Sequence, residues 1–178
     1  ISVGLTFGTF LLVSVLSGLE SIFPDFLVSF AGGLSAVSLG LIYAAIGVAH
    51  FTLTDEVLGI VPPIGTWGGL WQVPAPGADD LGLSYEKYHT VWSGAAEVGG
   101  GVVLAASGIG LLPEFLQQLD SFLLFVLTVV ITPANIFQFT HDATMGEKVP
   151  PMKYPDSHIV RGGLQIVLLS VLWKLALH

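Results

Sequence analysis

The chain has 178 residues, of which 53% are hydrophobic and only 10% are charged, and its mean hydropathy is +0.82. Soluble domains carry about 25% charged residues, so this charge deficit indicates a membrane protein. The net charge of −8, with five basic residues, argues against nucleic-acid binding and against a polybasic anchor on anionic lipid. The absence of cysteine excludes disulfides, thiolate metal sites and iron–sulfur ligation within this chain.

The first apolar segment, Ser2–Leu19, is uncharged and lies at the lower length limit for a membrane span. A helix in the membrane interface and the core of a cleavable signal are the alternatives. After a turn, Phe26–Phe51 is expected to span the membrane. One face of this span carries small residues suited to close helix packing, namely Gly32, Gly33, Ala36, Gly40, Ala44 and Gly47. We therefore expect an N-terminal segment, residues 1–25, and a membrane domain, residues 26–178.

A loop of residues 52–87 follows, and its prolines and glycines exclude a single helix. Loops of this length are uncommon unless they have a role. Trp67 and Trp71 predict that the loop lies on the membrane interface, where tryptophan is enriched.

Three further spans complete the expected bundle. Tyr88–Leu112 is apolar apart from Glu97, whose carboxylate costs roughly 2.5–3.5 kcal/mol at that depth and therefore needs a partner. Leu119–Thr140 contains Pro133, which predicts a kink. The last span is His158–Leu177. The expected fold class is all-α: a polytopic membrane protein with a four-helix transmembrane bundle and one additional apolar N-terminal helix.

The positions of lysine and arginine predict the orientation of the bundle. One end carries the loops 52–87 and 141–157, and four basic residues lie there: Lys87, Lys148, Lys153 and Arg161. Only Lys174 lies near the other end. The positive-inside rule places the long loops on the cytoplasmic side, or on the stromal side of a thylakoid. We expect an integral, multi-pass protein of a thylakoid or bacterial inner membrane.

Helical spacing gathers polar side chains into the half of the bundle beneath the long loops. His89 and Glu97 lie eight residues apart on one helix face, and Arg161 and Gln165 lie four apart on another. Arg161 is the basic residue expected to reach Glu97. The expected polar or ligand-binding cluster consists of His50, Glu97, Asn135, Arg161 and Gln165.

Several interpretations of these side chains stand open. Glu97 and Arg161 form a packing pair, line a site for a small molecule, quinone or pigment, or take part in proton relay or catalysis. The histidines either lie at the interface without a ligand or bind a metal, haem or chlorophyll, and the candidates are His50, His89, His141 and His158. The cofactor candidates are thus chlorophyll with carotenoid, quinone and haem.

Gly99–Gly101 favours close helix packing. It is not a phosphate-binding loop, because no strand precedes it and no lysine follows it. No catalytic residue is assigned, because the chain has no nucleophile elbow, Walker loop, zinc-protease helix or paired catalytic carboxylates.

Five short motifs, each at a helix end or inside a span, carry a resemblance. In chain order they are Gly47-x-x-His50-Phe51, Ser93-Gly94-x-x-Glu97, Gly110-Leu111-Leu112, Pro133-Ala134-Asn135-Ile136 and Arg161-x-x-x-Gln165. From Phe26 onward this pattern is similar to the DoxX-like family of small four-helix membrane proteins. The resemblance implies a four-helix bundle linked to quinol-dependent or other redox systems, often as an accessory subunit. The loop 52–87 and the segment Ser2–Leu19 depart from the family pattern and leave room for a partner surface.

The function expected from the sequence is a non-catalytic accessory or assembly subunit of a membrane electron-transfer complex, with photosystem-associated complexes among the candidates. It would stabilise or link partner subunits through its helices and loops. The alternative is a membrane oxidoreductase subunit that binds quinone or haem in a polar cavity around Glu97 and Arg161. A carrier or channel ranks third, since only Pro133 hints at a broken helix. The expected partners are the lipid bilayer and other membrane subunits, and not nucleic acid.

Overall fold

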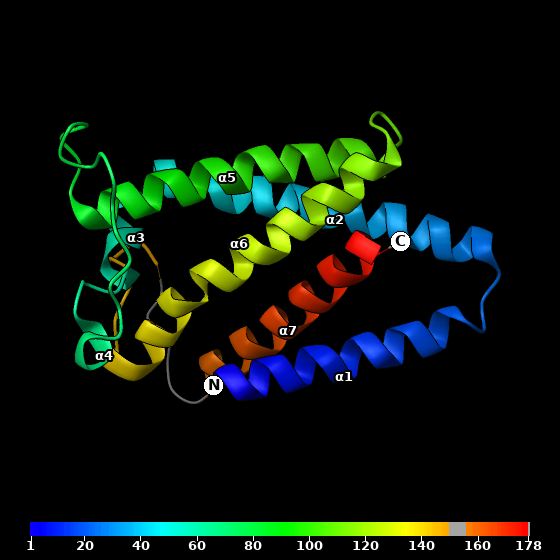
Figure 1. The fold of residues 1–178 in the computed structure, drawn as a ribbon, viewed down its shortest axis with the longest axis horizontal. Helices are drawn as coiled ribbons and strands as arrows, with labels where there is room; N and C mark the ends of the chain where they lie inside the picture. The colour runs from blue at the N-terminus through cyan, green and yellow to red at the C-terminus, as the bar shows by residue number, and fades with distance from the viewer. Residues whose placement is uncertain (150–155, 178) are drawn as a thin grey trace.

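The computed structural model describes residues 1–149 and 156–177, and this part of the chain is helical with irregular connections (Figure 1). Its long helices are α1 (Ser2–Glu20), α2 (Asp25–Thr52), α5 (Tyr85–Gly108), α6 (Glu114–His141) and α7 (Asp156–Leu177). The loop between α2 and α5 contains the short helices α3 (Thr54–Val57) and α4 (Thr66–Gly69) and a 3₁₀ turn, η1 (Leu58–Ile60). The all-α class expected from the sequence is confirmed.

Within the described ranges, four helices are long and apolar enough to cross a membrane: α1, α2, α6 and the His158–Leu177 part of α7. This finding confirms a multi-pass membrane protein, but the set differs from the expected one. The N-terminal helix α1, for which the sequence allowed alternatives, meets the criterion. Helix α5, which was expected to span, does not belong to the four; it contains Glu97 and several glycines, and its first turns are polar.

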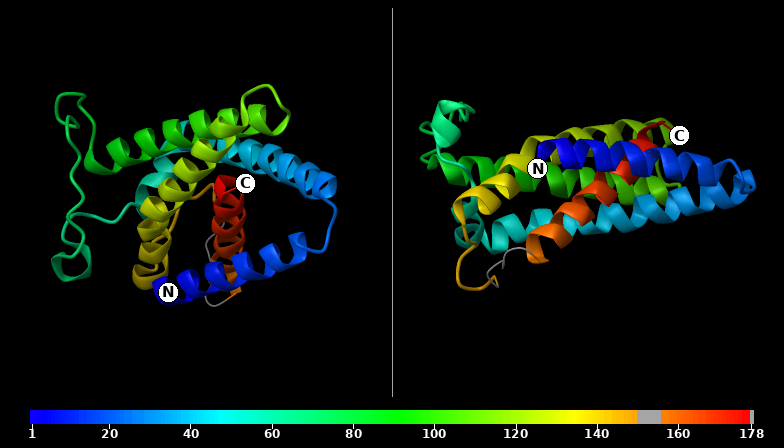
Figure 2. Two further views of the ribbon diagram at one scale, coloured as in Figure 1. Left: turned by 45° about the vertical axis from the view of Figure 1, so that its right-hand side comes forward. Right: turned by 90° about the horizontal axis from the view of Figure 1, so that it is seen from below.

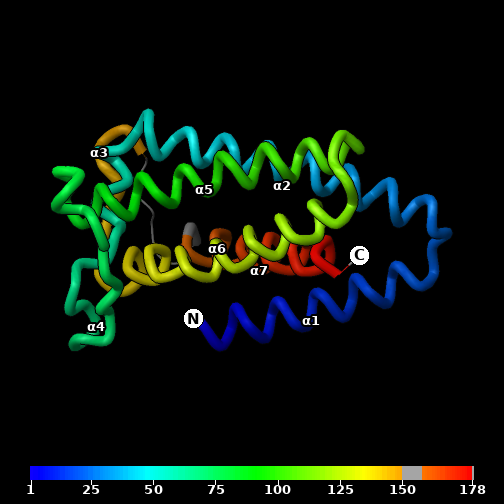
Figure 3. Tube along the Cα trace, turned by 45° about the horizontal axis from the view of Figure 1, so that its top comes forward, coloured from blue at the N-terminus to red at the C-terminus, as the bar shows by residue number. Residues whose placement is uncertain are grey.

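The helices pack in the spatial order α2, α5, α6, α7, α1. Helices α2 and α5 run side by side along most of their length (Figure 3). Helix α6 packs on α5 and on α7, and α1 returns along α7 (Figure 2). None of the residues of α1 is buried, so this helix closes one side of α7 without contributing to the core.

Local chemistry defines where the long helices begin. Pro24 and Pro113 precede α2 and α6, whose first residues, Asp25 and Glu114, place a negative charge at the positive end of the helix dipole. The Ser84 hydroxyl oxygen accepts a hydrogen bond from the Lys87 backbone N–H at 3.2 Å and caps α5. Helix α6 continues through Pro133.

Glycines allow α2 and α5 to approach to backbone contact. A Cβ atom added to Gly101 would lie 2.5 Å from the Gly40 carbonyl oxygen, and one added to Gly47 would lie 2.6 Å from the Gly94 carbonyl oxygen. The packing role expected for the small-residue face of α2 is therefore confirmed. Within Gly99–Gly101, Gly101 makes this contact, whereas a Cβ on Gly99 would meet nothing within 4 Å.

The loop 52–87 is folded onto the end of the bundle. The Trp67 indole N–H donates to the Thr140 hydroxyl at 3.1 Å, and its ring packs edge-on against Phe137 and His141 at the end of α6. The two long loops are joined by buried Glu56, whose carboxylate lies 3.5 Å from Lys148 Nζ. Residues 150–155 of the expected loop 141–157, with Lys153 among them, lie outside the described residues.

The α2–α5 contact predicts unequal effects of two alanine substitutions in one helix. Gly101→Ala is expected to destabilise the protein by about 1–3 kcal/mol, because the new methyl group must push the α2 backbone away. Gly99→Ala is the matched control, and it is expected to be neutral or to stabilise the helix slightly. Thermal unfolding in detergent, followed by circular dichroism, measures both. Equal midpoints for the two variants would contradict the backbone contact.

Candidate functional site

Glu97 lies in the contact between α2 and α5 and pairs with His50. Its Oε2 atom is 2.8 Å from His50 Nδ1, and the Glu97 side chain is only 2% exposed. The two atoms lie within ion-pair distance but do not have hydrogen-bond alignment. The expectation that Arg161 is the basic partner of Glu97 is wrong. His50 reaches Glu97 because Gly94, which packs directly against His50, has no side chain to keep α2 away.

A hydroxyl pair joins α2 to α6 nearby. Thr128 Oγ1 donates to the Leu124 carbonyl oxygen at 2.7 Å, and it also contacts the Tyr43 hydroxyl. A threonine hydroxyl has one hydrogen to donate, so Tyr43 is the donor in this pair. Both side chains are buried. The pair fixes the position of α6 relative to the glycine-lined contact of α2.

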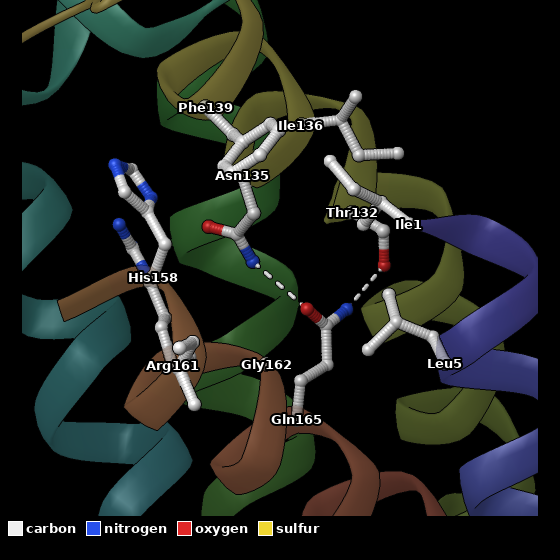
Figure 4. Close-up of a pocket in the computed structure, with 11 residues that line it drawn as sticks. Ile1, Leu5, Thr132, Asn135, Ile136, Phe139, His158, Arg161, Gly162 and Gln165 are labelled. Atoms are coloured by element: carbon white, nitrogen blue, oxygen red, sulfur yellow. Dashed lines mark hydrogen bonds between the residues drawn. The ribbon is translucent and has the colours of Figure 1, made fainter. Parts of the chain in front are cut away.

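A chain of amides and hydroxyls joins α6 to α7 (Figure 4). Asn135 Nδ2 donates to Gln165 Oε1 at 3.3 Å, and Gln165 Nε2 donates to Thr132 Oγ1. The Thr132 hydroxyl in turn donates to the Thr128 carbonyl oxygen at 2.7 Å. Two of the expected cluster residues, Asn135 and Gln165, therefore meet as the sequence spacing indicated.

Arg161 binds Gln138, a residue that the sequence analysis did not include in the cluster. Its Nη1 atom donates to Gln138 Oε1, and Gln138 is 3% exposed. A signal for Gln138 was available, because it lies three residues after Asn135 and therefore on the same stripe of α6. The guanidinium is thus held by an amide of α6, while the carboxylate of Glu97 lies in a different helix pair.

A cavity of about 290 Å³ opens beside this amide chain, between α6, α7 and α1. Its polar lining comes from Thr132, Asn135, His158, Arg161 and Gln165. Its apolar lining comes from Ile1, Leu5, Ile136, Phe139 and Ile159. Figure 4 shows Ile1, Leu5, Ile136 and Phe139 on one side of the Asn135 and Gln165 amides. The expected cluster thus divides in two. His50 and Glu97 lie between α2 and α5, whereas Asn135, Arg161 and Gln165 line the cavity.

The other candidate histidines have separate surroundings. His89 Nδ1 accepts a hydrogen bond from Trp92 Nε1 at 2.9 Å, and its ring packs against Tyr85, whose pKa is raised by burial. His141 packs beneath Trp67 at the end of α6, and His158 packs edge-on against Phe139 at the cavity. In the part of the chain that the structure describes, no cluster of three metal-ligating side chains forms.

No family model, curated protein or solved structure matches the chain. The similarity to the DoxX-like family stays a prediction from its five motifs.

The pairing of His50 with Glu97 predicts strong coupling between the two residues. Glu97→Gln alone is expected to cost about 3–5 kcal/mol of stability, because it leaves His50 without its charged partner in a buried contact. In a double-mutant cycle with His50→Gln, the combined loss is expected to be well below the sum. Unfolding in mixed detergent provides the free energies.

Arg161→Gln is the matched comparison for this cycle, since Arg161 is the residue that the sequence analysis expected to pair with Glu97. Its effect is expected to add to that of Glu97→Gln, because the two side chains lie in different helix pairs. Coupling of Glu97 to Arg161 rather than to His50 would contradict the arrangement.

Proposed function

We propose that this protein is a membrane subunit that binds a quinone in the cavity between α6, α7 and α1. The observation that carries the proposal is the composition of this cavity, in which amide, guanidinium and imidazole groups share one space with aliphatic and aromatic walls. Small-molecule sites typically combine an apolar lining with a few polar groups that fix orientation. A quinone has the same division, with a polar ring carrying two oxygens and an apolar tail.

The polar groups of the cavity suit both redox forms of the ring. Arg161 and His158 can donate hydrogen bonds to a quinone carbonyl oxygen. Asn135 uses its amide nitrogen toward Gln165, and Figure 4 draws its oxygen on the side away from Gln165, where it can accept from a quinol hydroxyl. The cavity therefore offers donors for the oxidised form and an acceptor for the reduced form.

The size and position of the cavity support a single-ring head group rather than a macrocycle. Its volume of about 290 Å³ lies at the lower end for ligand pockets, which run from about 300 to 1,000 Å³. Ile159 lines the cavity and is 69% exposed, so an apolar tail can leave over it toward the lipid. The alternative of a cavity around both Glu97 and Arg161 is replaced in this proposal by one around Asn135, Arg161 and Gln165.

A second candidate function is the accessory or assembly subunit of a membrane electron-transfer complex, photosynthetic complexes included. The observation that favours it is α1, a membrane-length helix that packs chiefly on α7 and has no buried residue. Its exposed Phe7, Phe10 and Leu11 offer a surface for a partner helix. The same proposal includes three expectations from the sequence. The protein belongs to the DoxX-like family, it lies in a thylakoid or bacterial inner membrane, and its long loops lie on the cytoplasmic or stromal side. A large native mass in mild detergent supports it, whereas migration as a free protein opposes it.

Two adjacent glycines of α7 give a matched test of the quinone site. Gly162 lines the cavity, Gly163 does not, and a Cβ on either would meet nothing within 4 Å. Gly162→Leu is expected to fill the cavity and weaken binding of a decyl-chain benzoquinone more than tenfold, while Gly163→Leu binds like the unmodified protein. Isothermal titration in lipid nanodiscs measures the affinities, and thermal unfolding confirms that both variants fold. Equal affinities in the two variants would overturn the proposal.

A further inference from the structure

A second cavity, of about 380 Å³, lies between α5 and α6 and contains a buried carboxylate. Helix α5 contributes Trp92, Ala96 and Gly100, which lie four residues apart on one face. Helix α6 contributes Asp120 and a set of leucines and valines. Asp120 is 8% exposed, and its Oδ2 atom has no hydrogen-bond partner. This cavity shares no lining residue with the one between α6 and α7.

Asp120 lies in a membrane-length helix, and no basic side chain among the described residues pairs with it. It is the seventh residue of α6, about 9 Å along the helix axis from Glu114. The ion pairs among residues 1–149 and 156–177 use other carboxylates: His50 with Glu97, Lys148 with Glu56, and Lys174 with Glu20. A carboxylate that is buried within a membrane-length helix usually marks a functional site. A bound cation would compensate the charge of Asp120.

The walls of the cavity restrict the kind of cation. The Trp92 indole N–H is used on His89 Nδ1, so the indole presents only its carbon surface to the cavity. The remaining lining side chains are aliphatic, and Asp120 supplies the only carboxylate. Calcium and magnesium need about six oxygen ligands, which these walls do not provide. An organic cation with apolar substituents fits better, because it gains a charge pair with Asp120, contact with the indole and burial of its substituents.

Access to the cavity is from the side of the bundle. Three of its lining residues on α6, Leu123, Val126 and Val130, are exposed and would face the bilayer. A lipophilic cation dissolved in the membrane can therefore enter between α5 and α6. A pocket of about 380 Å³ that opens sideways to the lipid has room for a small molecule.

We propose that the cavity around Asp120 binds a lipophilic organic monocation, of the ammonium or phosphonium type, through the Asp120 carboxylate and the Trp92 ring. This inference rests on α5 and α6 and is independent of the proposed quinone site.

The test uses the full chain in nanodiscs of zwitterionic phosphatidylcholine, with radiolabelled tetraphenylphosphonium as the probe. Equilibrium dialysis against empty nanodiscs corrects for partition into the lipid. Saturable binding at one site per chain is expected, and Asp120→Asn, which keeps the shape of the side chain, is expected to weaken it at least tenfold. Quenching of tryptophan fluorescence on binding is expected to be lost in Trp92→Leu.

Two neighbouring alanines of α5 give a matched pair of variants that separates loss of binding from loss of folding. Ala96 lines the cavity and Ala95 does not, and both are exposed. Ala96→Phe is expected to abolish saturable binding, and Ala95→Phe to leave it unchanged. Unaltered binding in both Asp120→Asn and Ala96→Phe, or no binding beyond empty nanodiscs, overturns the proposal. Loss of a native assembly in Asp120→Asn, without any probe binding by the unmodified protein, would instead assign Asp120 to a basic residue of a partner subunit.

Discussion

The close approach of α2 and α5 is the constraint on which the rest of the structure depends. Glycines at 40, 47, 94 and 101 bring the two backbones together, so neither helix can slide or rotate without a clash. This contact sets the register that places His50 against Glu97 in the interior. Van der Waals packing of small residues is the main source of helix association in lipid, where no hydrophobic force drives helices together. The buried ion pair follows from this packing, because a side chain at position 94 would occupy the space of His50.

Outside the α2–α5 pair, α6 connects two polar regions of different character. Toward α7 it presents Thr132, Asn135 and Gln138, which form a hydrogen-bonded network with Gln165 and Arg161. Toward α5 it presents Asp120, whose Oδ2 atom has no hydrogen-bond partner among the described residues. The amide network borders a cavity suited to a neutral ring with oxygen atoms, whereas Asp120 borders a cavity suited to a cation. Helix α6 thus lies between two cavities with different polar groups, one on its α7 side and one on its α5 side.

The sequence predicted the membrane class and the small-residue face of α2, and it placed Asn135 and Gln165 in one cluster, because each of these depends on local composition or helical period. It did not predict the partner of Glu97. Counting residues from helix ends assumes that neighbouring helices begin and end at one level, but His50 lies two residues before the end of α2 and Glu97 lies twelve residues after the start of α5. Helix α5 therefore projects beyond α2, and only the tertiary register reveals it. Asp120 was visible as the one charge within Leu119–Thr140, but its cavity depends on the absence of a side chain at Gly100.

A difference spectrum would show whether the polar cavity between α6 and α7 holds a quinone. The protein is isolated from its native membrane in mild detergent, and its ultraviolet and visible absorption is recorded before and after reduction with borohydride. We expect bleaching of a quinone band at about one quinone per chain. An unchanged spectrum, or a visible band from haem or chlorophyll, would mean that the cavity does not hold a quinone.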